Sequence, residues 1–206
     1  MVSNINKLNL DLIALYRCNY LAQFHIRQMA RLIGKSHVGL LPHLKELEKN
    51  KILISKEVGR SKVYSLNLNN NQVREFLAFA EKNKSIELLN NEVFIKKIYD
   101  EFTNLDLGGS LVLFGSYASK THTPESDVDL FYLGDLNESE NKKIKSLGKI
   151  YNKGIHLVSM NLKQFREQLS NQGILAKEII NNHIILYNHD IFVNEVWRYY
   201  HERKER

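Results

Sequence analysis

Cysteine and proline are scarce in this sequence, and long apolar runs are missing. The single cysteine, Cys18, cannot form a disulfide within the chain, which favours a reducing, cytoplasmic location. With only two prolines, Pro42 and Pro124, no Pro-rich linker marks a domain boundary. No apolar stretch approaches the ~20 residues needed to span a bilayer, and the first residues lack a signal-peptide cleavage site. We therefore expect no membrane association.

Positive charge is concentrated near the N-terminus. The chain has 206 residues, 43% of them hydrophobic, which suits one ordinary domain or two small ones. Residues 1–68 contain eleven Lys/Arg and four Asp/Glu, a formal charge of +7, whereas the other 138 residues have a formal charge of −1. This asymmetry predicts that the first part meets a polyanion and the second does something else.

The basic part begins with helix-forming sequence. Residues 8–20 have leucines at helical spacing, and two further helices are predicted on either side of a short turn. Gly34 is the expected C-cap of the first of these, and Ser36 the N-cap of the second. The second helix has an apolar stripe of three leucines, Leu40, Leu44 and Leu47. Helix, short turn with glycine, helix is the helix-turn-helix arrangement.

A basic hairpin is predicted to follow these helices. The segment ILISKEVGRSKVYSLNL alternates apolar and polar residues on both sides of Gly59-Arg60, as two antiparallel strands do. Three helices and this hairpin resemble the winged helix-turn-helix DNA-binding domains of many prokaryotic regulators, on residues 8–68. The resemblance implies that the second helix of the pair enters the major groove and the wing touches the backbone. Its implied contacts to double-stranded DNA are Arg31, Lys35, His37, Leu41, His43, Lys45, Lys56, Arg60 and Lys62.

Other interpretations of the basic part stay open. The lysines can be a solvated surface, or a winged helix can serve as a protein dock. Three histidines, His25, His37 and His43, do not have the spacing of a usual metal site, so we expect no metal there. Residues 69–105 form helices throughout, with a break and a domain boundary expected near residues 82–85.

The most informative stretch is LFGSYASKTHTPESDVDLFYL, residues 113–133. An apolar strand over residues 110–114 is followed directly by Gly115 and Ser116. A second strand includes Asp127 and Asp129, whose side chains share one face because strand side chains alternate. Two carboxylates this close repel each other unless a cation lies between them, and Mg²⁺ prefers one or two carboxylates plus substrate phosphates. Gly115 would let the backbone approach those phosphates.

This pattern resembles the nucleotidyltransferase superfamily related to DNA polymerase beta, most closely its minimal prokaryotic branch. The matching residues are Gly115, Ser116, Ser126, Asp127 and Asp129, and the likeness extends over roughly residues 91–190. The resemblance implies transfer of a nucleoside monophosphate from an NTP to a hydroxyl, with two metal ions, Mg²⁺ or Mn²⁺, at the two aspartates. It also implies that Gly115, Ser116 and Ser126 bind the triphosphate.

The family's third carboxylate is expected on the next strand, over residues 154–160, where this chain has His156. Imidazole is a poor Mg²⁺ ligand beside a carboxylate, so nucleotide binding is better supported than turnover. Three other acids, Asp135, Glu138 and Glu140, can take the role only if their loop folds back; their setting indicates the start of an exposed helix instead. We keep His156 as a catalytic candidate.

The sequence therefore predicts an α+β protein with an N-terminal winged helix-turn-helix and a C-terminal nucleotidyltransferase-like mixed sheet flanked by helices. The expected domains are residues 1–68, a helical connector at 69–84, and residues 85–206. The first functional hypothesis is a DNA-binding transferase that modifies a protein or nucleic-acid hydroxyl, as antitoxin-like relatives modify partner toxins. The second is a transcriptional regulator whose degenerate transferase domain only senses a nucleotide. A third is an enzyme acting on the nucleic acid that the winged helix binds. A homodimer is compatible with all three.

Overall fold

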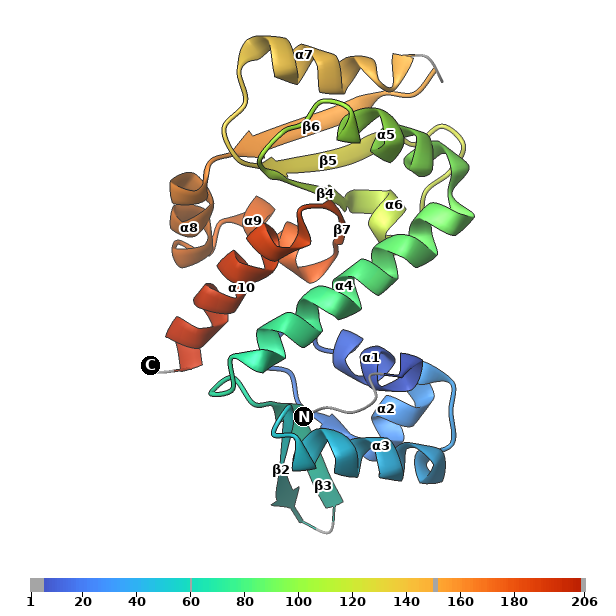
Figure 1. Ribbon diagram of the computed structural model, residues 1–206, viewed down its shortest axis with the longest axis vertical. Helices are drawn as coiled ribbons and strands as arrows, with labels where there is room; N and C mark the ends of the chain where they lie inside the picture. The colour runs from blue at the N-terminus through green and yellow to red at the C-terminus, as the bar shows by residue number, and fades with distance from the viewer. Residues whose placement is uncertain (1–5, 60, 150–151, 205–206) are drawn as a thin grey trace. The chain divides into compact units, whose positions relative to one another are not determined.

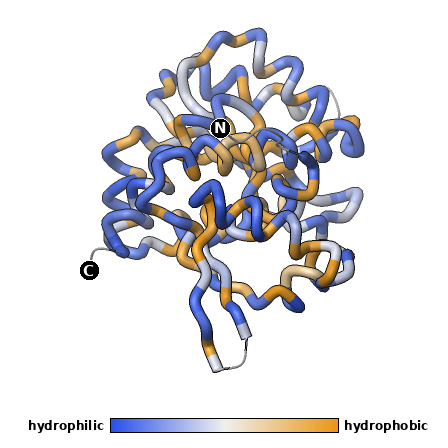
Figure 2. The backbone as a smooth tube through the Cα atoms, turned by 60° about the horizontal axis from the view of Figure 1, so that its bottom comes forward, coloured by the Kyte–Doolittle hydropathy of each residue, from blue (hydrophilic) through white to orange (hydrophobic). Residues whose placement is uncertain are grey.

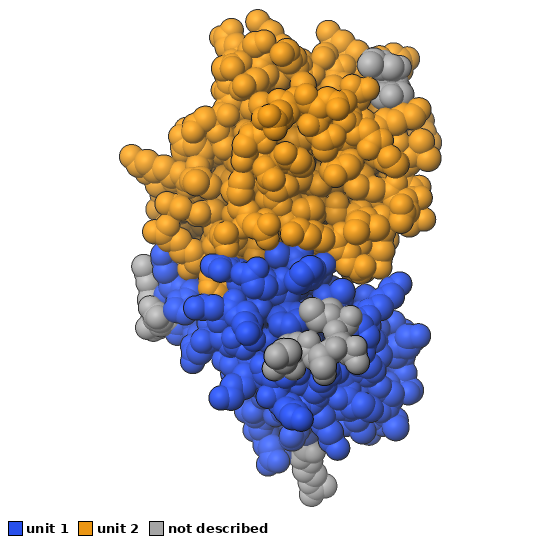
Figure 3. All heavy atoms as spheres, viewed as in Figure 1, with its two compact units in different colours: residues 1–80, 200–206 blue, residues 81–199 orange. Residues whose placement is uncertain are grey.

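The computed structural model describes residues 6–59, 61–149 and 152–204 of the chain. Arg60, one of the predicted DNA contacts, lies outside these ranges. The chain divides into two compact units, shown in different colours in Figure 3: unit 1 comprises residues 1–80 and 200–206, and unit 2 comprises residues 81–199. No helix in the described part of the chain is long and apolar enough to cross a membrane.

Unit 1 consists of short helices and a small antiparallel sheet with strand order β1-β3-β2 (Figure 1). Its first elements are α1 (Lys7–Ala14), β1 (Phe24–His25), α2 (Ile26–Ile33), α3 (His37–Lys49), β2 (Leu53–Val58) and β3 (Ser61–Leu66). The inner stripe of α3 is confirmed, because Leu40, Leu44 and Leu47 are at most 1% exposed.

The turn between α2 and α3 has the predicted caps. Gly34 adopts a left-handed conformation, with φ of +71°, and its N–H donates to the carbonyl oxygens of Ala30 and Arg31. The Ser36 hydroxyl accepts a hydrogen bond from the Gly39 N–H at 3.1 Å. These caps satisfy backbone groups that the helix ends leave without partners, so α2 and α3 are joined by a tight, defined turn.

Two features of unit 1 differ from the sequence-based expectation. The first helix ends at Ala14, and the chain then makes turns as far as Leu21 instead of staying helical to residue 20. The short strand β1 was not expected, because its residues fit the helical pattern of α2. It pairs with β3 through Phe24 and Tyr64, a contact between segments forty residues apart that local periodicity cannot reveal.

The hairpin of β2 and β3 projects from unit 1, and its path is visible in Figure 2. Its register pairs Lys56 with Val63 and Glu57 with Lys62. Gly59 lies in its turn with φ of +62°, a conformation that favours glycine. The alternating pattern of the sequence therefore predicted the hairpin correctly.

The predicted helix break near residues 82–85 is wrong. One helix, α4 (Gln72–Asn91), continues through this stretch, and the break lies at Glu92, before α5 (Val93–Thr103). The stretch 82–85 contains neither glycine nor proline, so no residue in it disfavours helical backbone. Ala80, Glu81 and Ser85 lie on neighbouring turns of this helix and are all buried. Their burial favours a helix that continues through residues 82–85.

Unit 2 is built on a mixed sheet with strand order β6-β5-β4-β7 (Figure 1). Strand β4 is antiparallel to β5 and β7, whereas β5 and β6 are parallel. The remaining elements are β4 (Ser110–Phe114), α6 (Gly115–Ser119), β5 (Val128–Leu133), α7 (Glu138–Ser146), β6 (Ile155–Met160), α8 (Leu162–Ser170), α9 (Ile174–Asn181), β7 (Ile184–Tyr187) and α10 (His189–Lys204). The mixed sheet with flanking helices agrees with the predicted α+β nucleotidyltransferase-like fold.

Helices cover both faces of this sheet. On one face, Leu130 and Tyr132 of β5 pack with apolar residues of α5 and α7. On the other face, Phe131 lies 5.2 Å from Phe165 of α8, which in turn lies 5.8 Å from Phe192 of α10, ring centre to ring centre. Because Asp129 and Phe131 are two residues apart on a strand, Asp129 lies on the second face.

Unit 2 also contains a histidine that is strongly affected by burial. Burial lowers the pKa of His189 to about 4; Glu81 and Asp190 oppose this shift and Lys82 adds to it. In the unfolded chain the pKa is about 6.5, so between pH 6.5 and 4 the unfolded state binds more protons. His189 therefore adds to stability above pH 6.5, and about 3 kcal/mol of stability is lost as the pH falls toward 4.

We expect His189→Gln to remove this part of the acid sensitivity. The measurement is urea unfolding of both proteins between pH 4 and 7, followed by the fluorescence of Trp197, the only tryptophan of the chain and part of unit 2. The free energy of unfolding of the wild type should fall more steeply with decreasing pH than that of the variant, because only the wild type has an imidazole at this position that takes up a proton on unfolding. Parallel pH profiles would contradict the assignment.

Candidate functional site

Both aspartates of the D-x-D motif lie at one end of the unit 2 sheet. Asp129 is the second residue of β5, paired with Phe114 on β4 and with His156 on β6. Gly115 follows Phe114 directly and begins α6. The flanking residues Val128 and Leu130 are fully buried, as predicted. The chain thus brings the carboxylate of Asp129 to the turn that follows β4.

Gly115 is in direct contact with this carboxylate. A Cβ atom built on Gly115 would lie 2.1 Å from Oδ2 of Asp129, and the backbone here has a φ of +64°. The carbonyl oxygen of Gly115 also accepts a hydrogen bond from Nδ2 of Asn182 at 3.2 Å. Only glycine satisfies both the conformation and the space. The glycine predicted to approach a ligand therefore also makes room for Asp129.

A second glycine does the same for the other aspartate. A Cβ atom on Gly154 would lie 2.2 Å from Oδ1 of Asp127, and the Gly154 carbonyl accepts a hydrogen bond from the Val128 N–H at 2.9 Å. Beside it, Nζ of Lys153 donates to the carbonyl oxygens of Pro124 and Ser126. Sequence reasoning missed Lys153 and Gly154. The sequence feature that could have indicated them is the Lys-Gly pair immediately before β6, the strand that runs parallel to β5.

The loop between α6 and β5 is closed by its own polar residues. Oγ of Ser126 accepts a hydrogen bond from the Thr123 N–H at 2.9 Å, and the Thr121 N–H donates to the carbonyl of Ser116 at 3.0 Å. The rings of Tyr117 and His122 stack with centres 4.0 Å apart. These contacts hold the backbone of Ser126 next to Asp127. Ser116 and Ser126 are both partly exposed.

His156 occupies the place on β6 that is level with Asp129. Its Nδ1 lies 3.3 Å from Oδ1 of Asp129, and the two side chains are 66% and 28% exposed. The parallel register places both residues on the same face of the sheet. The structure therefore places His156 beside Asp129, where the sequence predicted it.

The three alternative acids lie elsewhere. Glu138 and Glu140 are in the first turn of α7, where the Glu140 carboxylate accepts a hydrogen bond from the Asn137 N–H at 2.8 Å in a capping box. Asp135 follows the far end of β5. Within the described ranges, no three His, Cys, Asp or Glu side chains are grouped so that they could hold a metal ion. Asp127 and Asp129 are the carboxylates that the D-x-D motif brings to this end of the sheet.

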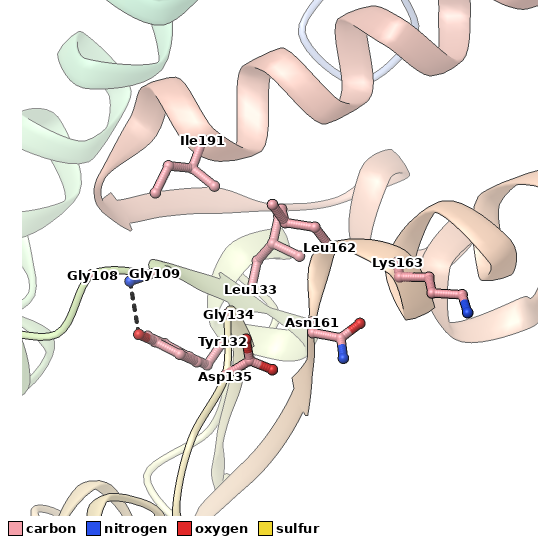
Figure 4. Close-up of a pocket in the computed structure, with 10 residues that line it drawn as sticks. All are labelled: Gly108, Gly109, Tyr132, Leu133, Gly134, Asp135, Asn161, Leu162, Lys163 and Ile191. Atoms are coloured by element: carbon pink, nitrogen blue, oxygen red, sulfur yellow. Dashed lines mark hydrogen bonds between the residues drawn. The ribbon is translucent and has the colours of Figure 1, made fainter.

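A pocket of about 460 Å³ lies at the opposite end of the same sheet (Figure 4). It is lined by residues before β4 and after β5 and β6, among them Gly109, Asp135 and Lys163. The Tyr132 hydroxyl accepts a hydrogen bond from the Gly109 N–H at 2.7 Å, and burial raises the pKa of Tyr132, which keeps it protonated. Because Asp129 is near the beginning of β5 and the lining residues Tyr132 and Leu133 are at its end, the pocket is not part of the site at the aspartates.

The predicted DNA contacts in the described residues lie on four elements of unit 1 and in the turn after α2. Arg31 is on α2 and Lys35 in the turn after it, Lys56 is on β2, and Lys62 is on β3. His37, Leu41, His43 and Lys45 are on α3, where His37, Leu41 and Lys45 are exposed.

His43 differs from its neighbours on α3. Its Nδ1 lies 2.8 Å from Oδ1 of Asn9 on α1, and the ring is only partly exposed. This contact uses one ring nitrogen of His43 to join α1 and α3, so the side chain is less available to a ligand than those of His37 and Lys45.

Residues 95–186 match a family model described as a nucleotidyltransferase domain. The matched stretch is somewhat under half of the chain and contains Gly115, Asp127, Asp129 and His156. Such a domain takes an NTP as substrate and usually needs a divalent metal, so the predicted class of chemistry is supported.

The other comparisons add little. A solved structure described as "Crystal structure of the toxin-antitoxin with AMP-PNP" is 19% identical, covering 56% of this chain and 92% of that one, with a TM-score of 0.35. At that TM-score the likeness carries no argument about this chain. No curated protein matches the sequence.

Proposed function

We propose that the chain is a DNA-binding nucleotidyltransferase. Its nucleotidyltransferase domain takes an NTP with Mg²⁺ or Mn²⁺ and transfers the nucleoside monophosphate to a hydroxyl of a partner protein or a nucleic acid. The observation that carries this proposal is the contact between Gly115 and Asp129, where a Cβ would lie 2.1 Å from the carboxylate. A backbone free of side chains beside an acidic strand is what a metal-bound triphosphate requires.

The donor set at the aspartates fits a hard divalent cation. Mg²⁺ in such sites is held by one or two carboxylates and completes its shell with phosphate oxygens and water. Asp127 and Asp129 supply the carboxylates, and Gly115, Ser116 and Ser126 lie where they can face the triphosphate. In the transfer, the acceptor oxygen bonds to the α-phosphorus, the bond to the bridging oxygen breaks, and pyrophosphate leaves. We assign His156, with its exposed ring, as the group that takes the acceptor's proton.

A second function is favoured by one observation. His156, and not a carboxylate, is in register with Asp129, and the alternative acids Asp135, Glu138 and Glu140 lie elsewhere. A site with two carboxylates binds an ion and a nucleotide but lacks a ligand for a second ion. The alternative is therefore a transcriptional regulator that senses a nucleotide without transferring it.

The proposal assigns DNA binding to unit 1, as a winged helix-turn-helix over residues 1–68. It is supported by the succession of α1, α2 and α3, the tight turn at Gly34, and the hairpin that follows. The formal charge of +7 on this segment suits a phosphate backbone. Residues 69–84 and 85–206 are then the connector and the transferase domain.

The deciding experiment compares wild type with Asp127→Asn/Asp129→Asn. Each protein is incubated with Mg²⁺ and α-labelled NTPs, alone and with cell extract. We expect label on a macromolecular acceptor with wild type and a loss of at least about 100-fold in the variant, because the ion has lost its charged ligands. Calorimetry measures NTP binding in parallel.

Three outcomes separate the hypotheses. Transfer that depends on the aspartates supports the enzyme. Binding of NTP that depends on the aspartates, without transfer, supports the sensor, and the sensor's affinity for DNA should then change with NTP. If neither transfer nor aspartate-dependent NTP binding occurs, both assignments are wrong.

A further inference from the structure

The outward face of α3 combines apolar and cationic side chains. Leu40, Leu44 and Leu47 are buried, so the opposite face of the helix is outward. Val38 and Leu41 are 62% and 40% exposed, although both are large and apolar. They are three residues apart in the helix and therefore neighbours on its surface.

No exposed acidic side chain lies on α3, every residue of which the structure describes. Glu46 accepts a hydrogen bond from Nδ2 of Asn9 at 3.0 Å, which ties it to α1. Glu48 accepts one from the Ser55 hydroxyl and lies 3.9 Å from Nζ of Lys62, which ties it to the hairpin. Both carboxylates are thus used within unit 1, and the outward face of the helix keeps only its positive charges.

The cations around the apolar pair are exposed. Lys45 and Lys49 are on α3 itself, and Arg31 and Lys35 lie at the end of α2 and in the turn that precedes α3. A partner complementary to this face is polyanionic and has apolar groups between its charges. The major groove of duplex DNA has this combination, because each thymine places a 5-methyl group there between two rows of phosphates.

We infer that Val38 and Leu41 contact thymine methyl groups, so that α3 prefers A·T pairs that carry the methyl. This inference rests on the proposed DNA binding by unit 1 and adds the class of sequence that the helix selects. Apolar side chains form no hydrogen bonds with base edges, and the thymine methyl is the apolar group that the major groove offers them. The lysines and arginines supply the sequence-independent part of the affinity.

The expected effect follows from the area that a methyl group buries. Burial of one methyl-sized group changes the affinity by roughly three- to fourfold. Contact with two methyl groups therefore gives a preference on the order of tenfold.

The test uses two duplexes with equal charge that differ only in the methyl group, alternating poly(dA-dT) and poly(dA-dU). The dissociation constant of the full chain for each is measured by competition at several salt concentrations. We expect wild type to bind the thymine duplex about tenfold more tightly, and Val38→Ala/Leu41→Ala to bind both equally. Because both side chains are exposed, this variant keeps its fold, which circular dichroism checks. Its salt slope should match that of wild type.

A matched variant separates the apolar contribution to DNA binding from the electrostatic one. Lys35→Ala/Lys45→Ala should weaken binding to both duplexes equally and reduce the salt slope, while the thymine preference stays. Salt-dependent binding with no difference between the duplexes overturns the methyl contact and leaves the proposed function intact. No salt-dependent duplex binding overturns both the methyl contact and the DNA binding proposed for unit 1.

Discussion

Gly115→Ala is expected to lower NTP-dependent activity, or NTP affinity if the domain is a sensor, by about 100-fold. The new methyl group would lie 2.1 Å from Oδ2 of Asp129 and 2.9 Å from its Cγ. Either the carboxylate or the turn after β4 must move by about an ångström, and a displacement of that size at a reacting centre costs about two orders of magnitude. Label transfer and calorimetric binding with each NTP measure the effect.

Gly34→Ala provides the matched control for this prediction. Gly34 has a φ of +71°, close to the +64° of Gly115, but a Cβ there would meet nothing within 4 Å. Both substitutions place alanine in a left-handed conformation, at a cost of about 1–2 kcal/mol in stability. Only Gly115→Ala adds the clash with Asp129. Equal nucleotide binding by the two variants would show that the close approach of Gly115 to the carboxylate has no functional role.

The parts of the site that are local in sequence could be predicted. The apolar run before Gly115 and the alternation around Asp129 define two buried strands, because burial and pleating act over neighbouring residues. The caps at Gly34 and Ser36 are equally local, since each depends on a backbone conformation or a hydroxyl within four residues. These features needed no knowledge of the rest of the chain.

Contacts between distant segments could not be derived in this way. Gly154 lies against Asp127 and Lys153 fixes the preceding loop, although both are more than twenty residues further along the chain. The resemblance to a family suggested that His156 would lie near Asp129, and the parallel register of β5 and β6 places it there. Periodicity alone gives no register between strands.

The helical stretch before the sheet shows a different limit of prediction from sequence. Pattern and composition favour helix throughout residues 69–105, but they do not say where one helix ends and the next begins. The chain continues α4 past the expected break and turns at Glu92, because residues 82–85 contain neither glycine nor proline and Glu81 and Ser85 are buried. The burial of Glu81 has no signature in the sequence, because its partner, His183, lies 102 residues away.

We expect the stability of unit 2 to depend on the interaction between Glu81 and His183. Glu81 and His183 are each 1% exposed, and Oε1 of Glu81 lies 3.0 Å from Nε2 of His183. Nδ1 of the same ring lies 3.1 Å from the carbonyl oxygen of Ile180, which can only accept. Nδ1 is therefore the ring nitrogen that donates to this carbonyl. The pair joins α4 to the loop before β7.

Glu81→Ala is expected to destabilise unit 2 by about 3–5 kcal/mol, because it leaves a buried polar ring nitrogen facing an empty volume. Glu81→Gln should recover most of this loss, since its amide can donate to a neutral imidazole in nearly the same space. Asp100→Ala is the control: its ion pair with Lys96 has an N–O distance of 2.6 Å but is about half exposed on both sides, so its loss should cost under about 1 kcal/mol. Urea unfolding followed by Trp197 fluorescence measures all three. If Glu81→Ala proves no more damaging than Asp100→Ala, the buried pair does not hold α4 to the sheet of unit 2, and the apolar contacts of α4 must do so.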